Sequence, residues 1–325
     1  MTDLFKQIAD LSSEKRALLK LLLKEQGIDL ASIPITPVKR EGDPSALPSV
    51  AGQALPLSFA QQRLWFLDQL EPGSPLYNIP VAMRLAGALD VTALERGLNE
   101  IIHRHEILRT TFATEGDQPI QIIAPSLALP VSLTDLQRLP APEREAEALR
   151  LATEEAQRPF DLTQGPLIRA RLLRLADDDH VALLTLHHIV ADGWSADILI
   201  REMTALYQAF STGNPTLLPD LPLQYADFAA WQRAWLDGDV LESQLEYWKK
   251  QLGGELPALE LPADRPRPAV QTYRGAHFSF TLPPGLPPKM KALARQEEAT
   301  LFMTSLAVFQ TLLHRYTGQD DICVG

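Results

Sequence analysis

The sequence is short of cysteine, of long apolar runs and of positive charge. Its single cysteine, Cys323, excludes an internal disulfide, and the N-terminal stretch MTDLFKQIADLSSEKR carries charges where a signal peptide requires an apolar run. These features indicate a reducing, cytosolic compartment. The most apolar stretch, residues 301–313, is interrupted by polar side chains and falls short of the roughly 20 residues of a membrane span. It predicts a buried helix, and no membrane contact is expected.

Acidic residues outnumber basic ones. The chain has 41 Asp and Glu against 30 Lys and Arg, which gives a formal net charge of −11. A surface of that sign repels a phosphate backbone, and no basic stripe interrupts it, so nucleic acid is not an expected partner. Internal repeats and a GxSxG nucleophile elbow are also absent from the sequence. What remains is a chain of ordinary globular composition, whose 325 residues suffice for about two domains or lobes.

Proline and glycine divide the chain. Strong helix formers over 14–26, followed by Gly27, predict one short amphipathic helix near the N-terminus. Clustered prolines before the first globular part predict an extended linker, and a second proline-rich stretch, 257–268, lies after it. The expected division is 1–30, a helical leader and docking segment; 31–56, a proline-rich linker; 57–235, a first lobe; and 236–325, a linker and partial second lobe.

Strand and helix signals alternate through the first lobe, which predicts a mixed α/β fold class. Helices are expected at 58–70, after an N-cap at Asp90, and at 142–157, 195–210 and 225–236; strands are expected at 79–85, 119–123, 167–175 and 181–188. The second lobe is expected to have a strand at 277–282, two helices and the start of another strand near Ile322.

The segment HHIVADGWS, residues 187–195, follows an apolar strand and leads into a helix. Because successive strand side chains point to opposite faces, His187 and His188 cannot both face one cavity. A histidine at a strand end, beside a turn at Asp192 and Gly193, can project into a crevice where an imidazole exchanges a proton near neutral pH. The alternative is a pair of interior histidines satisfied by backbone carbonyls, and the residues alone leave both interpretations open.

The same segment contains zinc-ligand types, since a carboxylate follows the histidines by four residues. The two imidazoles diverge, however, and no second His or Cys stands at helical spacing nearby. We therefore expect no metal site. Cys323 lies in a predicted strand, and no feature of the sequence indicates a covalent intermediate.

The pattern HHxxxDG in this segment resembles a motif of the condensation domains of nonribosomal peptide synthetases, within the chloramphenicol-acetyltransferase-like superfamily. SFAQQRLWFL at 58–67 is similar to the first core motif of that family, RHEILRTTF at 104–112 to the second and YADFAAW at 225–231 to the fourth, in the family's order. The resemblance runs from about Leu57 to the end of the chain. It implies an α/β fold with a mixed sheet: a chloramphenicol-acetyltransferase-like lobe, followed by an incomplete second lobe of the same type.

The resemblance also implies a reaction. The amino group of an acceptor aminoacyl thioester attacks the carbonyl of a donor acyl or peptidyl thioester, which forms an amide. An ammonium must lose a proton and an oxyanion must be stabilised, so one imidazole can serve either as a base or as a hydrogen-bonding positioner. We assign this imidazole to His188, and the sequence does not choose between the two roles.

Other residues of the motif are expected to support that imidazole. His187 and Asp192 would hold its loop, Gly193 would allow a substrate arm to approach closely, and Ser195 completes the motif. By the resemblance, Asp192 is structural and is held by an arginine. Arg109 is our choice of partner, so the sequence predicts an ion pair between Arg109 and Asp192.

The implied partners are carrier domains. Both substrates would hang on 4′-phosphopantetheine arms of a donor and an acceptor carrier domain, with an adenylation domain adjacent in the parent synthetase and no intrinsic cofactor. The motif forms look most like domains that join two L-configured residues. Residues 1–30 resemble a segment that docks an upstream subunit, and an unstructured leader is the alternative.

One departure from the family is the end of the chain at DICVG, where a fifth core motif would begin. The second lobe would then be incomplete, one wall of the channel would be lacking, and the last strand would leave an unpaired edge. We therefore expect this chain to be impaired alone. Two alternatives remain: a stand-alone acyltransferase of the same superfamily, and a non-catalytic interaction fragment.

Overall fold

A computed structural model gives the fold of residues 35–38, 54–216, 218–266, 269, 275–276 and 278–324. The expected leader helix within 1–30, and most of the expected linker at 31–56, lie outside the described residues. The chain divides into two compact units between Gly238 and Asp239. The sequence placed its boundary after residue 235.

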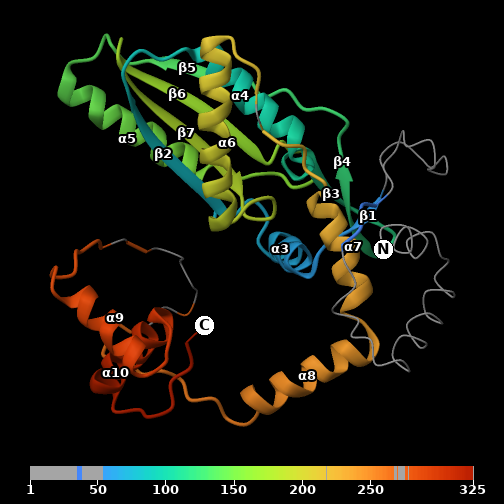
Figure 1. Cartoon of the computed structure of the whole chain (residues 1–325), viewed down its shortest axis with the longest axis vertical. Coiled ribbons are helices and arrows are strands. Elements are labelled where there is room, and N and C mark those ends of the chain that lie inside the picture. The colour runs from blue at the N-terminus through green and yellow to red at the C-terminus, as the bar shows by residue number, and fades with distance from the viewer. Residues whose placement is uncertain are drawn as a thin grey trace. The chain divides into compact units, whose positions relative to one another are not determined.

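The larger sheet of the first unit has four strands in the order β2–β7–β6–β5 (Figure 1). β7 pairs antiparallel with both neighbours, and only two residues, Asp177 and Asp178, connect β6 to β7. So short a connection is typical of a hairpin, and it fixes the register of the pair. The strands are β2 (Asn78–Ala86), β5 (Ser132–Asp135), β6 (Ile168–Ala176) and β7 (Asp179–His187).

Helices cover both faces of this sheet (Figure 1). Along β7, Leu184 and Leu186 point toward α4 and α6, whereas Leu183 points toward α5, as the two-residue period of a strand requires. The lobe therefore has three layers, with an apolar cluster on each side of the sheet. The helices are α4 (Val91–Arg104), α5 (Ala141–Gln157) and α6 (Gly193–Thr212).

A smaller sheet, in the order β1–β4–β3, carries a third apolar cluster. Phe112 from β3 is fully buried there, beside Leu64 and Trp65 of α3. Ser58 caps α3 through a capping box with Gln61. The elements are β1 (Leu55–Pro56), α3 (Phe59–Leu70), a 3₁₀ turn (Glu106–Arg109), β3 (Thr110–Glu115), β4 (Gln118–Ile123) and α7 (Tyr225–Trp235).

The regular elements of the second unit, within the described residues, are helices. α9 and α10 contact one another, and the side chains buried there are Ala294, Thr304 and Leu313. None of the helices within the described ranges combines the length and apolar character that a bilayer crossing requires. The helices of this unit are α8 (Gly238–Leu252), α9 (Leu286–Gln296) and α10 (Leu301–Thr317).

The mixed α/β class is confirmed, and four expectations about single elements were wrong or incomplete. Residues 278–282 form no strand, and Phe278 and Phe280 are exposed, because the described part of this unit offers no strand to pair with. The strand expected near Ile322 is absent for the same reason. Residues 301–313 form the expected helix, but most of their apolar side chains are exposed. The sequence also passed over β1, β3, β5 and α8.

Candidate active site

The HHIVADGWS segment occupies the end of a central strand. β7 ends at His187, α6 begins at Gly193, and the five residues between them form a tight connection (Figure 1). The N–H of Val190 donates to the carbonyl of His187 at 3.0 Å, which closes the turn. Because β7 pairs with a strand on each side, the start of this loop is fixed by the sheet.

The imidazole of His187 is buried at 3% exposure. It lies between two rings, 6.3 Å from Tyr77 and 6.1 Å from Phe160 between centroids, and the contact with Phe160 is edge-on. The N–H of Ile189 donates to Nδ1 of His187 at 3.1 Å, so the proton of the neutral ring is on Nε2. Burial first, and the neighbouring charge of His188 second, lower the pKa of His187 to about 4. At neutral pH this ring is therefore an uncharged hydrogen-bond acceptor.

His188 has the opposite environment. Its side chain is exposed, while its backbone N–H donates to the carbonyl of Tyr77 at 2.8 Å. Among the described residues, no group forms a hydrogen bond with its imidazole. The two histidines thus differ as strand alternation predicts: one packs into the lobe, and the other is free to meet a ligand. An exposed imidazole on a fixed backbone can form a hydrogen bond with a ligand.

Asp192 is the N-cap of α6. Its Oδ1 accepts from the N–H of Ser195 at 2.8 Å and from the hydroxyl of Ser195 at 2.7 Å, and the N–H of Asp192 lies 3.3 Å from that hydroxyl oxygen. These hydrogen bonds, foremost the one from the hydroxyl, hold the pKa of the Asp192 carboxyl below its usual value, and the nearby charge of His188 lowers it further. The Asp192 carboxylate therefore serves as the N-cap that stabilises the start of α6.

The predicted ion pair between Arg109 and Asp192 is wrong. Arg109 donates to the carbonyl of Ala124 and lies 3.8 Å from the carboxylate of Glu106. Among the described residues, Asp192 instead forms its hydrogen bonds with Ser195, in the capping box of α6.

Gly193 is the first residue of α6, and it has no positive φ. A Cβ added there would meet no atom within 4 Å. The fold therefore does not require glycine at this position, and the space beside it is open. Trp194, the next residue, is 81% exposed.

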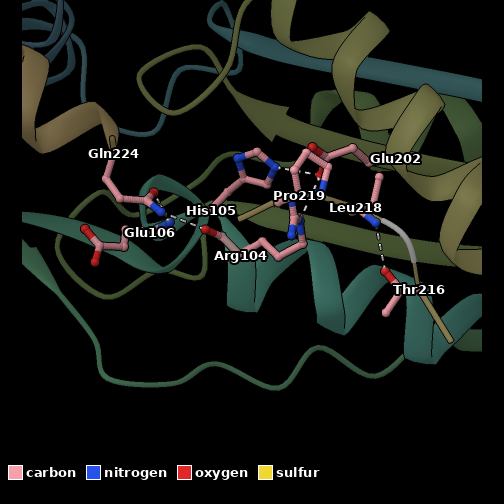
Figure 2. A network of polar contacts seen from close by, with 8 residues as sticks. All are labelled: Arg104, His105, Glu106, Glu202, Thr216, Leu218, Pro219 and Gln224. Atoms are coloured by element: carbon pink, nitrogen blue, oxygen red, sulfur yellow. Dashed lines mark hydrogen bonds and ion pairs between the residues drawn. The ribbon is translucent and has the colours of Figure 1, made fainter. Parts of the chain in front are cut away.

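A second cluster of polar side chains joins the neighbouring helices, as Figure 2 shows. Glu202 of α6 is buried, and its Oε2 lies 2.8 Å from Nε2 of His105 and 3.4 Å from Nε of Arg104. Arg104 also donates to the carbonyl of Pro219 at 2.8 Å, which ties down the connection after α6. Gln224, the N-cap of α7, donates to the carbonyl of Arg104 at 2.9 Å. We call these residues the Glu202 cluster.

The sequence did not find Glu202. It stands on the inward stripe of α6 with Leu199, Met203 and Leu206, and a carboxylate among apolar residues at helical spacing is the signal that could have identified it. Arg104 and His105 belong to the segment RHEILRTTF, so the cluster gives that segment a structural role: it fastens α4 to α6.

The two remaining segments that the sequence singled out also contact each other. The hydroxyls of Ser58 and Tyr225 are 2.9 Å apart, and Arg233 donates to the carbonyl of Leu57 at 2.7 Å. The guanidinium of Arg233 lies 4.0 Å from the ring centroid of Phe59. α3 and α7 are thereby held together. Throughout the described ranges, no group of three or more His, Cys, Asp or Glu side chains could hold a metal ion.

Comparison with known proteins adds to this geometry. The family model described as the Condensation domain matches residues 51–325. One of the linear gramicidin synthase proteins of Brevibacillus parabrevis is 55% identical over 296 residues, which are 91% of this chain and 4% of that protein. Phosphinothricin tripeptide synthetase PhsC of Streptomyces viridochromogenes is 47% identical over 100% of this chain and 29% of its own length. The chain thus spans only a small part of these relatives.

Solved structures agree on the fold. A structure titled as the complex of the X-domain and OxyB from teicoplanin biosynthesis matches with a TM-score of 0.69 and 30% identity, over 86% of this chain and 60% of that chain. The first condensation domain of the CDA synthetase matches with a TM-score of 0.68 and 23% identity, over 83% of this chain and 64% of that chain. At that identity the second likeness concerns the fold alone.

Proposed function

Because this chain belongs to the condensation-domain family, we propose that it forms the amide bond between two carrier-bound thioesters in nonribosomal peptide synthesis. The donor is an acyl or peptidyl thioester and the acceptor is an aminoacyl thioester. The observation that carries the proposal is the exposed imidazole of His188 on a backbone fixed at the end of β7. The chloramphenicol-acetyltransferase-like architecture expected from the sequence is in keeping with the likeness to a solved condensation domain.

The chemistry requires one proton-handling group. The acceptor ammonium loses one proton, and its nitrogen forms a bond to the donor carbonyl carbon. The nitrogen of the tetrahedral intermediate then loses a second proton as the carbon–sulfur bond breaks. One of the two protons neutralises the thiolate that leaves, and the other is released. His188 is suited to this transfer, either as the base or as the group that orients the amine, because its ring is exposed and not engaged by the described residues.

The neighbours of His188 support it without reacting. His187 accepts a hydrogen bond from Ile189, and Asp192 starts α6, so both ends of the loop are fixed. The open space at Gly193 is where a phosphopantetheine arm would pass. Arg109 has no role in the proposed reaction, which uses no intrinsic cofactor.

The partners follow from the reaction. A donor and an acceptor carrier domain would present the substrates, with an adenylation domain adjacent, and residues 1–30 would dock an upstream subunit. We further propose that the domain joins two L-configured residues, that it works in the cytosol, and that this chain alone is impaired. The chain covers 60% and 64% of the two solved chains named above, which supports the last point.

The test is a single-turnover assay with two loaded carrier domains, run on this chain and on a version extended through the rest of the domain. We expect the extended version to form the amide faster, and to use an L-configured donor in preference to its D-epimer. His188→Ala should abolish product while leaving the melting temperature unchanged. If His188→Ala keeps most of the wild-type rate, the assignment of His188 is wrong.

Two other functions remain testable in the same assay. The X-domain named above was solved in a complex with OxyB, which supports an interaction module as the second candidate. In that case the extended version would bind a partner protein but form no amide with either donor. A stand-alone acyltransferase would instead acylate a free amine or hydroxyl without any carrier domain as acceptor.

A further inference from the structure

The C-terminal end of α5 and the two residues after it are fastened to the sheet at the end where His187 lies. We call residues 155–159 the α5 turn. Arg169, near the start of β6, donates to the carbonyls of Arg158 at 2.8 Å, Pro159 at 3.2 Å and Glu155 at 3.2 Å, and its Nε also donates to the carboxylate of Glu155. One guanidinium thus makes four contacts within a five-residue turn, a use of its planar fork that lysine cannot reproduce.

A second side chain fastens the same turn from the neighbouring strand. Asn78 of β2 donates to the carbonyls of Ala156 at 2.8 Å and Arg158 at 2.9 Å. In the sheet, Asn78 lies opposite His187 and Arg169 lies opposite Thr185. Asn78 and Arg169, which both hold the α5 turn, are therefore the strand-pairing partners of two of the last three residues of β7.

Phe160 links this turn to the candidate active site. Its ring is buried, with the guanidinium of Arg169 3.7 Å from its centroid and the ring of His187 meeting it edge-on. The cation over the ring and the fixed turn leave Phe160 little freedom, so the His187 ring packs against a rigid surface. The same ring of His187 accepts a hydrogen bond from the N–H of Ile189 through Nδ1.

That hydrogen bond is one of the restraints on the loop. The N–H of His188 is held by Tyr77, and the next N–H along the chain is held by His187. If the His187 ring rotates, the second of these two restraints is lost and the His188 side chain gains freedom. From these contacts we propose that Arg169 and Phe160 are positioning residues: they fix the ring of His187, and through it the direction of His188. The proposal rests on the proposed function for its effect on rate, but its structural part can be measured without catalysis.

The test compares two arginines that hold opposite ends of β6. Arg144 donates to the carbonyls of Leu175, Gln137 and Leu139, and so clamps a turn as Arg169 does, but at the end of β6 away from His187. The variants are Arg169→Met, Arg169→Lys, Phe160→Leu and the control Arg144→Met. The readouts on this chain are the imidazole nitrogen signals of His187 in NMR spectra and the hydrogen exchange of the Ile189 amide. The readout on the extended version is the single-turnover rate of amide formation.

We expect Arg169→Met to speed exchange at Ile189 by about tenfold or more. In the same variant the rate of amide formation should fall about ten- to a hundredfold, with little change in KM for the acceptor carrier. Arg169→Lys should recover part of both effects, and Phe160→Leu should shift the His187 signals while preserving apolar volume. Arg144→Met should lower the melting temperature without altering the His187 signals.

Equal effects of Arg169→Met and Arg144→Met on the Ile189 amide would overturn the proposal, because Arg169 would then be only structural. So would a changed His187 signal in Phe160→Leu with an unchanged rate. Should Arg169→Met not fold, Arg169→Lys and Phe160→Leu decide the question by the same readouts. An unmodified extended version that forms no amide would instead contradict the proposed function, while the NMR and exchange results would still test the restraint on His187.

Discussion

The two units of this chain differ in how they bury apolar surface. In the first unit, three clusters of buried side chains lie between helices and two sheets, and Phe112, Leu172 and Leu206 are fully buried. In the described part of the second unit, α8 buries no side chain, and Phe302, Phe309 and Tyr316 of α10 stay exposed. Burial of apolar surface is the main stabilising contribution to folding. The first unit therefore carries its own stability, whereas the helices of the second need further surface to pack against.

The largest expected difference is in cooperative folding when the two units are expressed separately. We expect residues 54–238, expressed alone, to unfold in one sigmoidal transition. Residues 239–325 alone should show helix content without a cooperative transition, because so few of their side chains are buried. Circular dichroism during chemical denaturation measures both. A sharp transition in the second fragment would show that its helices form a core of their own.

Single core residues should repeat this contrast. Phe112→Ala empties a fully buried site, and we expect the free energy of unfolding of the first unit to fall by about 3 to 5 kcal/mol. Phe309→Ala, at a side chain 47% exposed, should change stability by about 0.5 kcal/mol or less. Urea denaturation of the two variants gives the difference, and similar losses in both would contradict the contrast.

Removal of a charged group should likewise destabilise the first unit more than the second. Glu202→Ala leaves the partly buried Arg104 and His105 without their carboxylate, so we expect a loss of about 3 kcal/mol. In the second unit, Asp320 pairs with His314 at the surface, with 93% of the Asp320 side chain exposed, and Asp320→Ala should cause no measurable change. Glu202→Gln, which keeps an acceptor oxygen, is the matched control and should lose less than Glu202→Ala.

Acid should weaken the first unit through His187. Its pKa is about 4 in the folded chain and 6.5 in the unfolded chain, so only the unfolded chain takes up a proton as the pH falls between these values. The stabilisation is fully present above pH 6.5 and is lost as the pH falls toward 4, by about 3 kcal/mol in total. Denaturation curves at several pH values measure this slope. His187→Gln should flatten it, and an unchanged slope would place the acid sensitivity elsewhere.

Helix caps should have a small effect that is similar in both units, because a cap is a local interaction. Asp192 caps α6 and Thr300 caps α10, each through a capping box. We expect Asp192→Ala and Thr300→Ala each to destabilise the capped helix by about 1 kcal/mol, measured from the loss of helix content during denaturation. Asp192→Ala should also be additive with Arg109→Ala, since the two side chains have separate partners. Strong coupling between them would restore the ion pair that the structure contradicts.

The sequence predicted what depends on local pattern. The apolar run before the histidines placed β7, strand alternation separated His187 from His188, and the N-cap at Asp90 placed the start of α4. The partners of buried charges were not predictable, because Glu202 meets Arg104 only after α4 and α6 pack together. A strand was also predicted at 277–282, but a strand requires a neighbour to pair with, and no residue pattern within the segment supplies one.

The open space at Gly193 makes this position suitable for measuring how much room a ligand needs in the site. Since an added Cβ meets no protein atom, Gly193→Ala and larger substitutions there should leave the folded chain intact. Any loss of turnover in such a series would then measure the clearance that the ligand itself needs, one side-chain size at a time. Substitution at Gly193 therefore measures the width of the passage beside this residue.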